Sequence, residues 1–119
     1  MEFLKNGAIF KIIRKRYAPV RYMVQVDTLD RIVDEYGLEK LDLIKIDVEG
    51  AELDVLNGSR GVLERDKPIL LIEVHFGYYD LKPETLYNLL KKLGYDLTIE
   101  KRPHKALVIA RPTRSFFKQ

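Results

Sequence analysis

Two stretches of the chain have the pattern of β-strands. In residues 41–48, Ile44, Ile46 and Val48 alternate with polar positions, which is the two-residue period of a strand. Residues 69–75 (ILLIEVH) are nearly all apolar, which is typical of a central strand covered on both faces. A helical stretch separates the two, so we expect a βαβ unit with parallel strands and a right-handed crossover.

Helical spacing of apolar positions predicts three helices. The first begins at residues 27–30 (DTLD), which offer capping side chains, and stops at Gly37. The second runs from residue 51 to about Gly58, and residues 60–65 are its continuation or a second turn. Pro68 closes that element, because proline disfavours helix at the residue before it. The third covers residues 83–94, with proline as its first residue and glycine as its last.

Four shorter runs complete the predicted elements. Residues 8–13 and 20–26 are β-prone and predict two strands joined by a charged loop. Residues 95–100 and 106–110 predict the last two strands, and the short link between them favours antiparallel pairing. The expected fold class is therefore α/β.

Length and composition bound the architecture. A chain of 119 residues forms one domain and buries about 65% of its unfolded surface. We divide the expected single domain, residues 1–119, into a basic β-rich segment (1–26), a body (27–111) and a basic tail (112–119). With no cysteine, the chain has no disulfide, no cysteine-based zinc site and no thiol catalysis.

Charge is segregated along the sequence. Residues 1–26 carry six Lys/Arg against one acid, residues 27–54 carry three against ten, and residues 101–119 carry six against none. The basic ends are interpreted as solvated segments that complement the acidic centre. No aromatic-interleaved motif suggests a nucleic-acid partner. Neither a bilayer-spanning run nor a signal peptide is visible, so the expected location is cytoplasmic, without a membrane partner.

Charged side chains mark the ends of the two central strands. Alternation puts Lys45, Asp47 and Glu49 on one face of the first strand, and Glu73 and His75 on one face of the second. We expect Lys45 and Glu73 to neutralise each other, because an unpaired charge inside a sheet is costly. Asp47 and His75 lie at carboxyl ends, where an open sheet forms its ligand crevice. There they can accept or relay a proton from a hydroxyl.

Each of these residues also has a structural interpretation. His75 is as consistent with a structural role as with a catalytic one. Glu49 and Glu52 are also explained as acids at a helix start, worth about 0.5–1 kcal/mol each, and for Glu52 this interpretation is favoured. The acids and His75 are suitable ligands for Mg²⁺ or Mn²⁺, but spacing alone assigns no metal site. His104 is expected in a solvated loop.

Residues 26–75 closely resemble the second half of the FkbM-type methyltransferases. Three motifs occur in the family's order: TLD at 28–30, KIDVEGAE at 45–52 and IEVH at 72–75. With weaker similarity, the resemblance extends over residues 20–111.

The resemblance implies a fold and an activity. Members of this family are S-adenosylmethionine-dependent enzymes that generally O-methylate hydroxyls of sugars or natural products. Their domain is a seven-stranded class I (Rossmann-like) sheet with helices on its faces. Residues 41–48 would be its fourth strand, residues 69–75 its fifth, and the final pair its sixth and seventh, the last antiparallel.

The resemblance also implies roles for single residues. Asp47 matches the family's acid at the end of the fourth strand, beside the methyl-transfer site. Glu49, Glu73 and His75 match neighbouring signature positions. These four are the candidate catalytic residues, and Asp47, with or without His75, would orient or deprotonate the acceptor hydroxyl.

The family's cofactor loop has no counterpart in this sequence. That loop has the form D-x-G-A-N-x-G, whereas the only glycine before Gly37 is Gly7. Without a glycine-rich turn at a helix N-terminus there is no preformed cofactor cradle, and no cofactor-binding residue is assigned. We therefore interpret the chain as the C-terminal half of the domain, inactive alone, whose partner is a complementing N-terminal half or a second copy covering the exposed strand edge.

Two alternatives remain at this stage. The chain is also consistent with a non-catalytic, truncated relative that acts as a binding or oligomerisation module. A small metal-dependent hydrolase built on the acid cluster is a weaker alternative.

Overall fold

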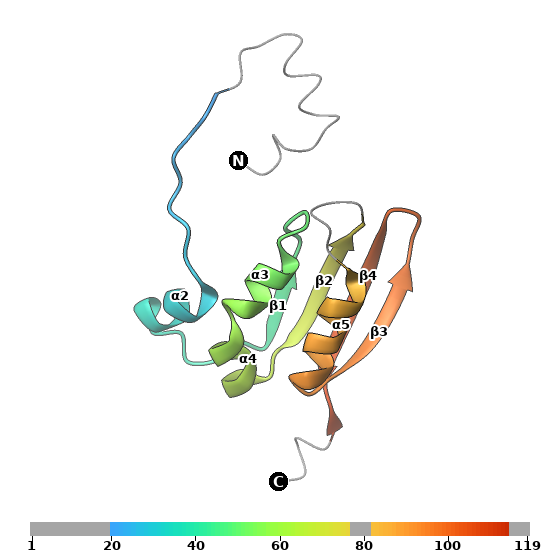
Figure 1. Cartoon of the computed structure of the whole chain (residues 1–119). Helices are drawn as coiled ribbons and strands as arrows, with labels where there is room; N and C mark the ends of the chain where they lie inside the picture. Colours follow the sequence, from blue (N-terminus) through green and yellow to red (C-terminus); the bar gives the residue numbers. More distant parts are fainter. Residues whose placement is uncertain (1–19, 77–81, 115–119) are drawn as a thin grey trace.

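A computed structural model describes residues 20–76 and 82–114 (Figure 1). The predicted strand over residues 8–13 lies outside them. The elements are α2 (Leu29–Tyr36), β1 (Leu43–Ile46), α3 (Glu52–Asn57), α4 (Arg60–Asp66), β2 (Ile69–His75), α5 (Pro83–Lys92), β3 (Tyr95–Lys101) and β4 (Lys105–Pro112). None of the described helices is long and apolar enough to cross a membrane.

The strands form one mixed four-stranded sheet in the order β1-β2-β4-β3. β1 and β2 are parallel and are connected through α3 and α4, as the predicted βαβ unit requires. β4 is antiparallel to both β2 and β3. The α/β class and the antiparallel C-terminal pair are therefore confirmed.

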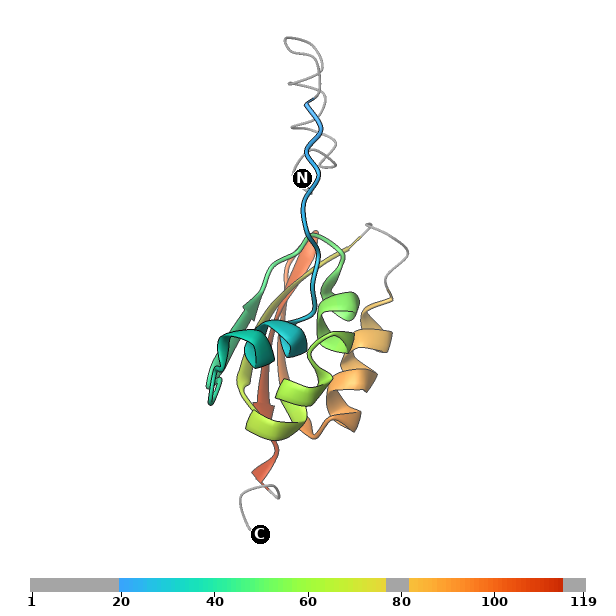
Figure 2. The same cartoon turned by 90° about the vertical axis from the view of Figure 1, so that its left-hand side faces the viewer.

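The helices α3, α4 and α5 all cover the same face of the sheet (Figures 1 and 2). Burial along β2 follows this arrangement: Leu70, Ile72 and Val74 are fully buried, whereas Leu71 and Glu73 on the other face are partly exposed. We predicted helices on both faces and a β2 covered on both. Among the described residues the second face has no helix, so the apolar side chains on it lack the cover that their composition implies.

The hydrophobic core fills the space between the sheet and these helices. α5 contributes the fully buried Leu86 and Leu90, which lie one turn apart on the predicted apolar stripe. Leu93 follows α5, and the strands and α3–α4 contribute the rest: Ile46, Leu56, Leu63, Leu70, Ile72, Val74, Tyr95, Val108 and Ala110. This packing fixes the strands whose carboxyl ends carry the charged residues.

Both ends of α2 are capped as predicted. The Thr28 hydroxyl accepts a hydrogen bond from the backbone N–H of Arg31 at 3.2 Å. Gly37 ends the helix with φ 62°, a left-handed conformation that favours glycine. Among the apolar residues of this helix, however, only Val33 is buried, and Tyr36 is 72% exposed.

A side chain of α2 also caps α4. The Asp30 carboxylate accepts hydrogen bonds from the backbone N–H groups of Gly61 and Val62, each at 2.9 Å. These are N–H groups of the first turn of α4, which have no partner within their own helix. Ser59, the residue before α4, makes no capping hydrogen bond with its side chain. Asp30 of the TLD motif therefore attaches α2 to α4.

One predicted strand was wrong. Residues 20–26 form no strand in the structure, and Met23 and Val26 are 100% and 86% exposed. A β-prone run becomes a strand only when it pairs with a neighbour, and the described sheet offers it none. The helix predicted to end at about Gly58 is α3, and residues 60–65 belong to a separate helix, α4, after a turn at Gly58 and Ser59.

Candidate functional site

Asp47 and His75 meet at one end of the sheet. Asp47 directly follows β1 and His75 is the last residue of β2, and the carboxyl ends of parallel strands lie at the same edge. His75 Nε2 lies 3.9 Å from Asp47 Oδ1 and 3.6 Å from Glu49 Oε1. Glu73 Oε2 is also 3.9 Å from the same nitrogen. The structure thus brings all four candidate residues together.

A fifth residue, Glu52, faces the opposite side of the His75 ring. Its Oε1 lies 3.6 Å from His75 Nδ1 and accepts the backbone N–H of Gly50 at 3.1 Å. Glu52 is fully buried, and its Oε2 accepts no hydrogen bond from any described residue. Each ring nitrogen of His75 therefore has a carboxylate beside it.

Sequence reasoning explained Glu52 as an acid at a helix start and left it out of the site. It is indeed the first residue of α3. A signal for its burial was available: residues 52, 56, 59 and 63 follow a helical spacing, and all four are buried. An acid on the buried face of a helix needs a partner, which here is His75.

The turn between β1 and α3 places Glu49. Glu49 has φ 53° and Gly50 has φ 105°. A left-handed conformation costs an ordinary L-residue about 1–2 kcal/mol. The turn holds Glu49 in it, with its carboxylate directed at His75 and 38% exposed.

The expected pairing of Lys45 with Glu73 was wrong. In the β1–β2 register Lys45 lies opposite Leu71, and its side chain is exposed. Glu73 instead meets Lys105 of β4, with Nζ 3.5 Å from Oε1. The sequence could not show this contact, because it depends on β4 lying beside β2.

Lys105 also affects the ionisation of Glu73. Burial alone would raise the pKa of the Glu73 carboxyl, but the neighbouring Lys105 ammonium lowers it. His75 and a hydrogen bond with Asp47 lower the pKa further, and the net result is a pKa below the ordinary value. Glu73 therefore remains charged inside the cluster.

The cluster carries more negative than positive charge. It contains the carboxylates of Asp47, Glu49, Glu52 and Glu73 around one imidazole, and Lys105 contacts only the last of them. Among the described residues, even a protonated His75 would leave two of these negative charges uncompensated, because four carboxylates face two cations. Such an arrangement can accept a proton or hold a cation. His104, by contrast, is an exposed residue of the β3–β4 link, as expected.

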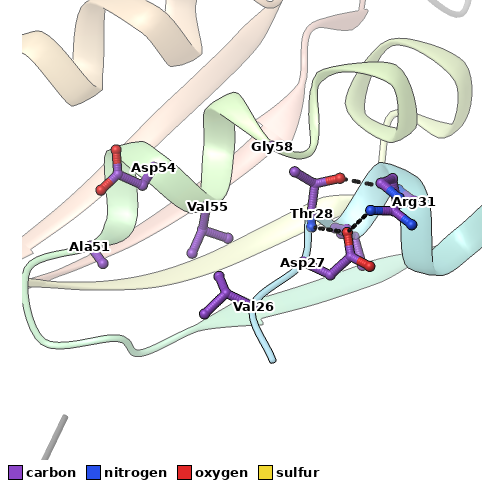
Figure 3. Close-up of a pocket in the computed structure, with 9 residues that line it drawn as sticks. Val26, Asp27, Thr28, Arg31, Ala51, Asp54, Val55 and Gly58 are labelled. Carbon is purple, nitrogen blue, oxygen red and sulfur yellow. Dashed lines mark hydrogen bonds and ion pairs between the residues drawn. The ribbon is translucent and has the colours of Figure 1, made fainter. Parts of the chain in front are cut away.

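A hollow of about 600 Å³ lies between α3 and the segment that leads into α2 (Figure 3). An ion pair between Asp27 and Arg31, 3.5 Å apart, belongs to its lining. The lining consists of Val26, Asp27, Thr28, Leu29, Arg31, Ala51, Asp54, Val55 and Gly58. Sequence reasoning gave Asp27 and Thr28 only a capping role, since it could not place α2 beside α3.

Comparison with known proteins agrees with the motifs. The family model described as the methyltransferase FkbM domain matches residues 11–97. The chain is similar to the AMB antimetabolite synthetase AmbE of Pseudomonas aeruginosa, 32% identical over 94 residues, which cover 76% of this chain and 4% of AmbE. It is also similar to the methyltransferase sdnD of Sordaria araneosa, 45% identical over 47 residues, which cover 33% of this chain and 18% of sdnD.

The chain therefore spans only a small part of these curated relatives. No solved structure matches it. The family match covers most of the chain and includes every residue of the acid–histidine cluster. The chain belongs to the FkbM methyltransferase family.

Proposed function

We propose that this chain supplies the acceptor side of an FkbM-type O-methyltransferase site. The reaction would transfer a methyl group from S-adenosylmethionine to a hydroxyl of a sugar or natural product. The observation that carries the proposal is the convergence of Asp47, Glu49 and Glu73 on Nε2 of His75, at the carboxyl ends of two parallel strands.

The topology supports the same proposal. β1 and β2, parallel and joined by helices, correspond to the fourth and fifth strands of a class I, Rossmann-like sheet. β3 and β4 correspond to the sixth and seventh, and β4 is antiparallel to its neighbours as the seventh strand should be. In this assignment the acid cluster lies next to the methyl-transfer site.

The cluster residues have separate tasks in this proposal. Asp47 and Glu49 are 41% and 38% exposed, so an acceptor hydroxyl can reach their carboxylates. Asp47 orients the hydroxyl and accepts its proton, together with His75. General-base catalysis of this kind contributes about 10²- to 10⁴-fold to a rate. Alignment of the oxygen with the methyl donor supplies the remainder.

The described residues do not fit the cofactor. S-adenosylmethionine would supply the methyl group, but its binding needs a glycine-rich turn at a helix N-terminus. The described glycines with positive φ are Gly37, Gly50 and Gly94, each isolated from the others in the sequence. We therefore assign the cofactor site to a complementing N-terminal half of the domain, placed against the open edge of β1.

The open edge also favours a second candidate function. Leu43 of β1 and Ile69 of β2 are 57% and 39% exposed, and the second face of the sheet has no helix among the described residues. An exposed strand edge and an apolar face are typical of a binding or oligomerisation module. Such a module would require no catalysis by His75.

Cofactor binding tests the half-site proposal. Isothermal titration of the 119-residue chain with S-adenosylmethionine should show no micromolar binding. A chain that bound the cofactor tightly by itself would contradict the assignment of that site to a complementing half.

Methyl transfer then separates the enzyme from the binding module. We expect transfer from labelled S-adenosylmethionine to a hydroxyl acceptor once a polypeptide carrying the family's D-x-G-A-N-x-G segment is added. His75→Gln should lower the rate about 100-fold or more. His104→Gln, at the exposed histidine, should leave the rate unchanged. No transfer by the wild-type chain would favour the non-catalytic module, whereas equal rates for wild type and His75→Gln would contradict the catalytic role of His75.

A further inference from the structure

We propose that Asp47, Glu49 and His75 bind a divalent transition-metal cation, and that Glu52 positions the imidazole for it. One ligand atom from each of the three residues lies within 4.8 Å of the others. Ligand atoms that share an ion at about 2.2 Å lie no more than about 4.4 Å apart. The His75–Asp47 and His75–Glu49 distances, 3.9 and 3.6 Å, already meet this limit.

The buried carboxylate of Glu52 provides independent support. Histidine ligands commonly donate their second ring N–H to a carboxylate, which fixes the tautomer and directs the other nitrogen to the metal. Glu52 Oε1 lies 3.6 Å from His75 Nδ1, and Glu52 is fully buried. Its second oxygen accepts no hydrogen bond within the described part of the chain. With the proton on Nδ1, beside Glu52, the nitrogen that would bind the cation is Nε2, which faces Asp47 and Glu49.

The charge of the cluster also calls for a cation. Lys105 contacts Glu73 alone, which leaves three carboxylates, those of Asp47, Glu49 and Glu52, around His75. Protonation of His75 compensates one of these charges. A divalent cation at Nε2 compensates two and places them between the carboxylates, where they are most effective.

The ligand types indicate the class of metal. One imidazole nitrogen with two carboxylate oxygens suits Mn²⁺ or Zn²⁺ better than Mg²⁺, which prefers oxygen ligands alone. Three protein ligands leave coordination positions for solvent or substrate. Asp47 and Glu49 are partly exposed, so those positions face outward.

The role of the cation deepens the proposed methyl transfer and rests on it. A hydroxyl bound to a divalent cation loses its proton more readily, since the metal stabilises the alkoxide. With the cation bound, His75 serves as its ligand and no longer accepts the proton itself, and Glu73, whose Oε2 lies 3.9 Å from His75 Nε2, receives it instead. Binding of the cation itself requires neither cofactor nor acceptor.

Titration of Mn²⁺ with the full chain, followed by electron paramagnetic resonance, tests the site. We expect one Mn²⁺ per chain, displaced by Zn²⁺. His75→Gln and Glu49→Gln should weaken Mn²⁺ binding at least tenfold. Glu64→Gln removes the same charge from an exposed position on α4 and should bind as wild type does. A folded wild-type chain that binds no Mn²⁺ at millimolar concentration overturns the proposal.

Two further variants cover folding and positioning. Asp47→Asn changes a partly exposed ligand outside any strand, so it tests the site even where His75→Gln disturbs the fold. Glu52→Gln should weaken binding about 10- to 100-fold, and Glu52→Asp should recover part of that loss. Full binding by Glu52→Gln removes the positioning role. If Mn²⁺ binds but no methyl transfer occurs under any condition, the metal site stands and the proposed function fails.

Discussion

Glu49 has a left-handed backbone conformation and a side chain that belongs to the candidate site. Its φ of 53° is one that L-residues avoid, yet its carboxylate lies 3.6 Å from His75 Nε2. Residues strained in this way are often found at functional sites, where the surrounding structure maintains them. Here the turn before α3 holds the strained conformation.

Replacement of Glu49 should therefore separate stability from function. Glu49→Gly should raise the free energy of unfolding by about 1 kcal/mol, because glycine adopts positive φ without steric cost. The same change should weaken Mn²⁺ binding at least tenfold. Glu49→Ala removes the carboxylate but keeps the strain, so the difference between the two variants in urea unfolding isolates the backbone effect. Equal stability of the two variants would contradict this account.

At the residue scale, strand position predicted that Asp47 and His75 lie at the same edge of the sheet, and they do. Glu49 and Glu73, which the resemblance added to the candidates, lie beside His75 as well, although the catalytic role of all four stays a prediction. The partner of Glu73 could not be predicted, because Lys105 reaches it from a strand 32 positions later in the sequence. Glu52 was missed because its helix-start position already explained an acid there.

Tyr95, the first residue of β3, illustrates how one element is attached to the core. Its ring is 2% exposed, and Lys67 Nζ lies 6.0 Å from the ring centroid. Its hydroxyl makes no hydrogen bond with any described residue. Burial raises the pKa of Tyr95 to about 12, from an ordinary value of 10.0.

This shift predicts a loss of stability in alkaline solution. The unfolded chain ionises Tyr95 near pH 10, whereas the folded chain keeps its proton until about pH 12, so stability is intact below pH 10 and falls as pH rises between the two. At pH 11 the ionisation of Tyr95 should lower the free energy of unfolding by about 1.4 kcal/mol. Urea unfolding of Tyr95→Phe should lack this loss, whereas Tyr36→Phe, at an exposed position, should retain it. An identical dependence of the free energy of unfolding on pH in Tyr95→Phe and wild type would contradict the role of Tyr95.

At the element scale, the sequence was sufficient to predict helices, because their caps and apolar spacing involve residues that are close together in the sequence. Capping residues and helical spacing predicted α2 and α5, since these depend on neighbours in sequence. The strand over residues 20–26 was wrong because a strand depends on its pairing partner. The position of β4 between β2 and β3 follows from packing and has no local signal.

At the scale of the whole molecule, the helices of the described residues cover one face of the sheet and leave the other without a helix. Leu71, Leu107 and Ile109 lie on the side of the sheet opposite to the core and are only half-buried. β1 pairs with β2 alone among the described strands. The resemblance to one half of a larger sheet predicts such an edge. The uncovered face differs from the prediction, because the apolar sequence of β2 is typical of a strand covered on both faces.

An open apolar face and edge should make the chain associate with a second copy when no complementing half is present. We expect light scattering to show a dimer that Leu43→Lys converts to monomer, because that change places a charge on the exposed end of β1. Thr98→Lys adds the same charge on β3, at the far edge of the sheet, and should leave the dimer intact. A wild-type chain that is monomeric at all concentrations would contradict this expectation.

The unpaired side of β1 has a consequence for how its partner can be found. In an edge strand every second backbone N–H points away from the sheet, so alternate amides of Leu43–Ile46 are left to solvent among the described residues. Those amides should exchange with deuterium rapidly, whereas the amides of β2 are protected on both sides. If a partner strand pairs with β1, exchange should become slower at these alternate positions. The measurement would thus detect the pairing at each residue, whichever polypeptide supplies the strand.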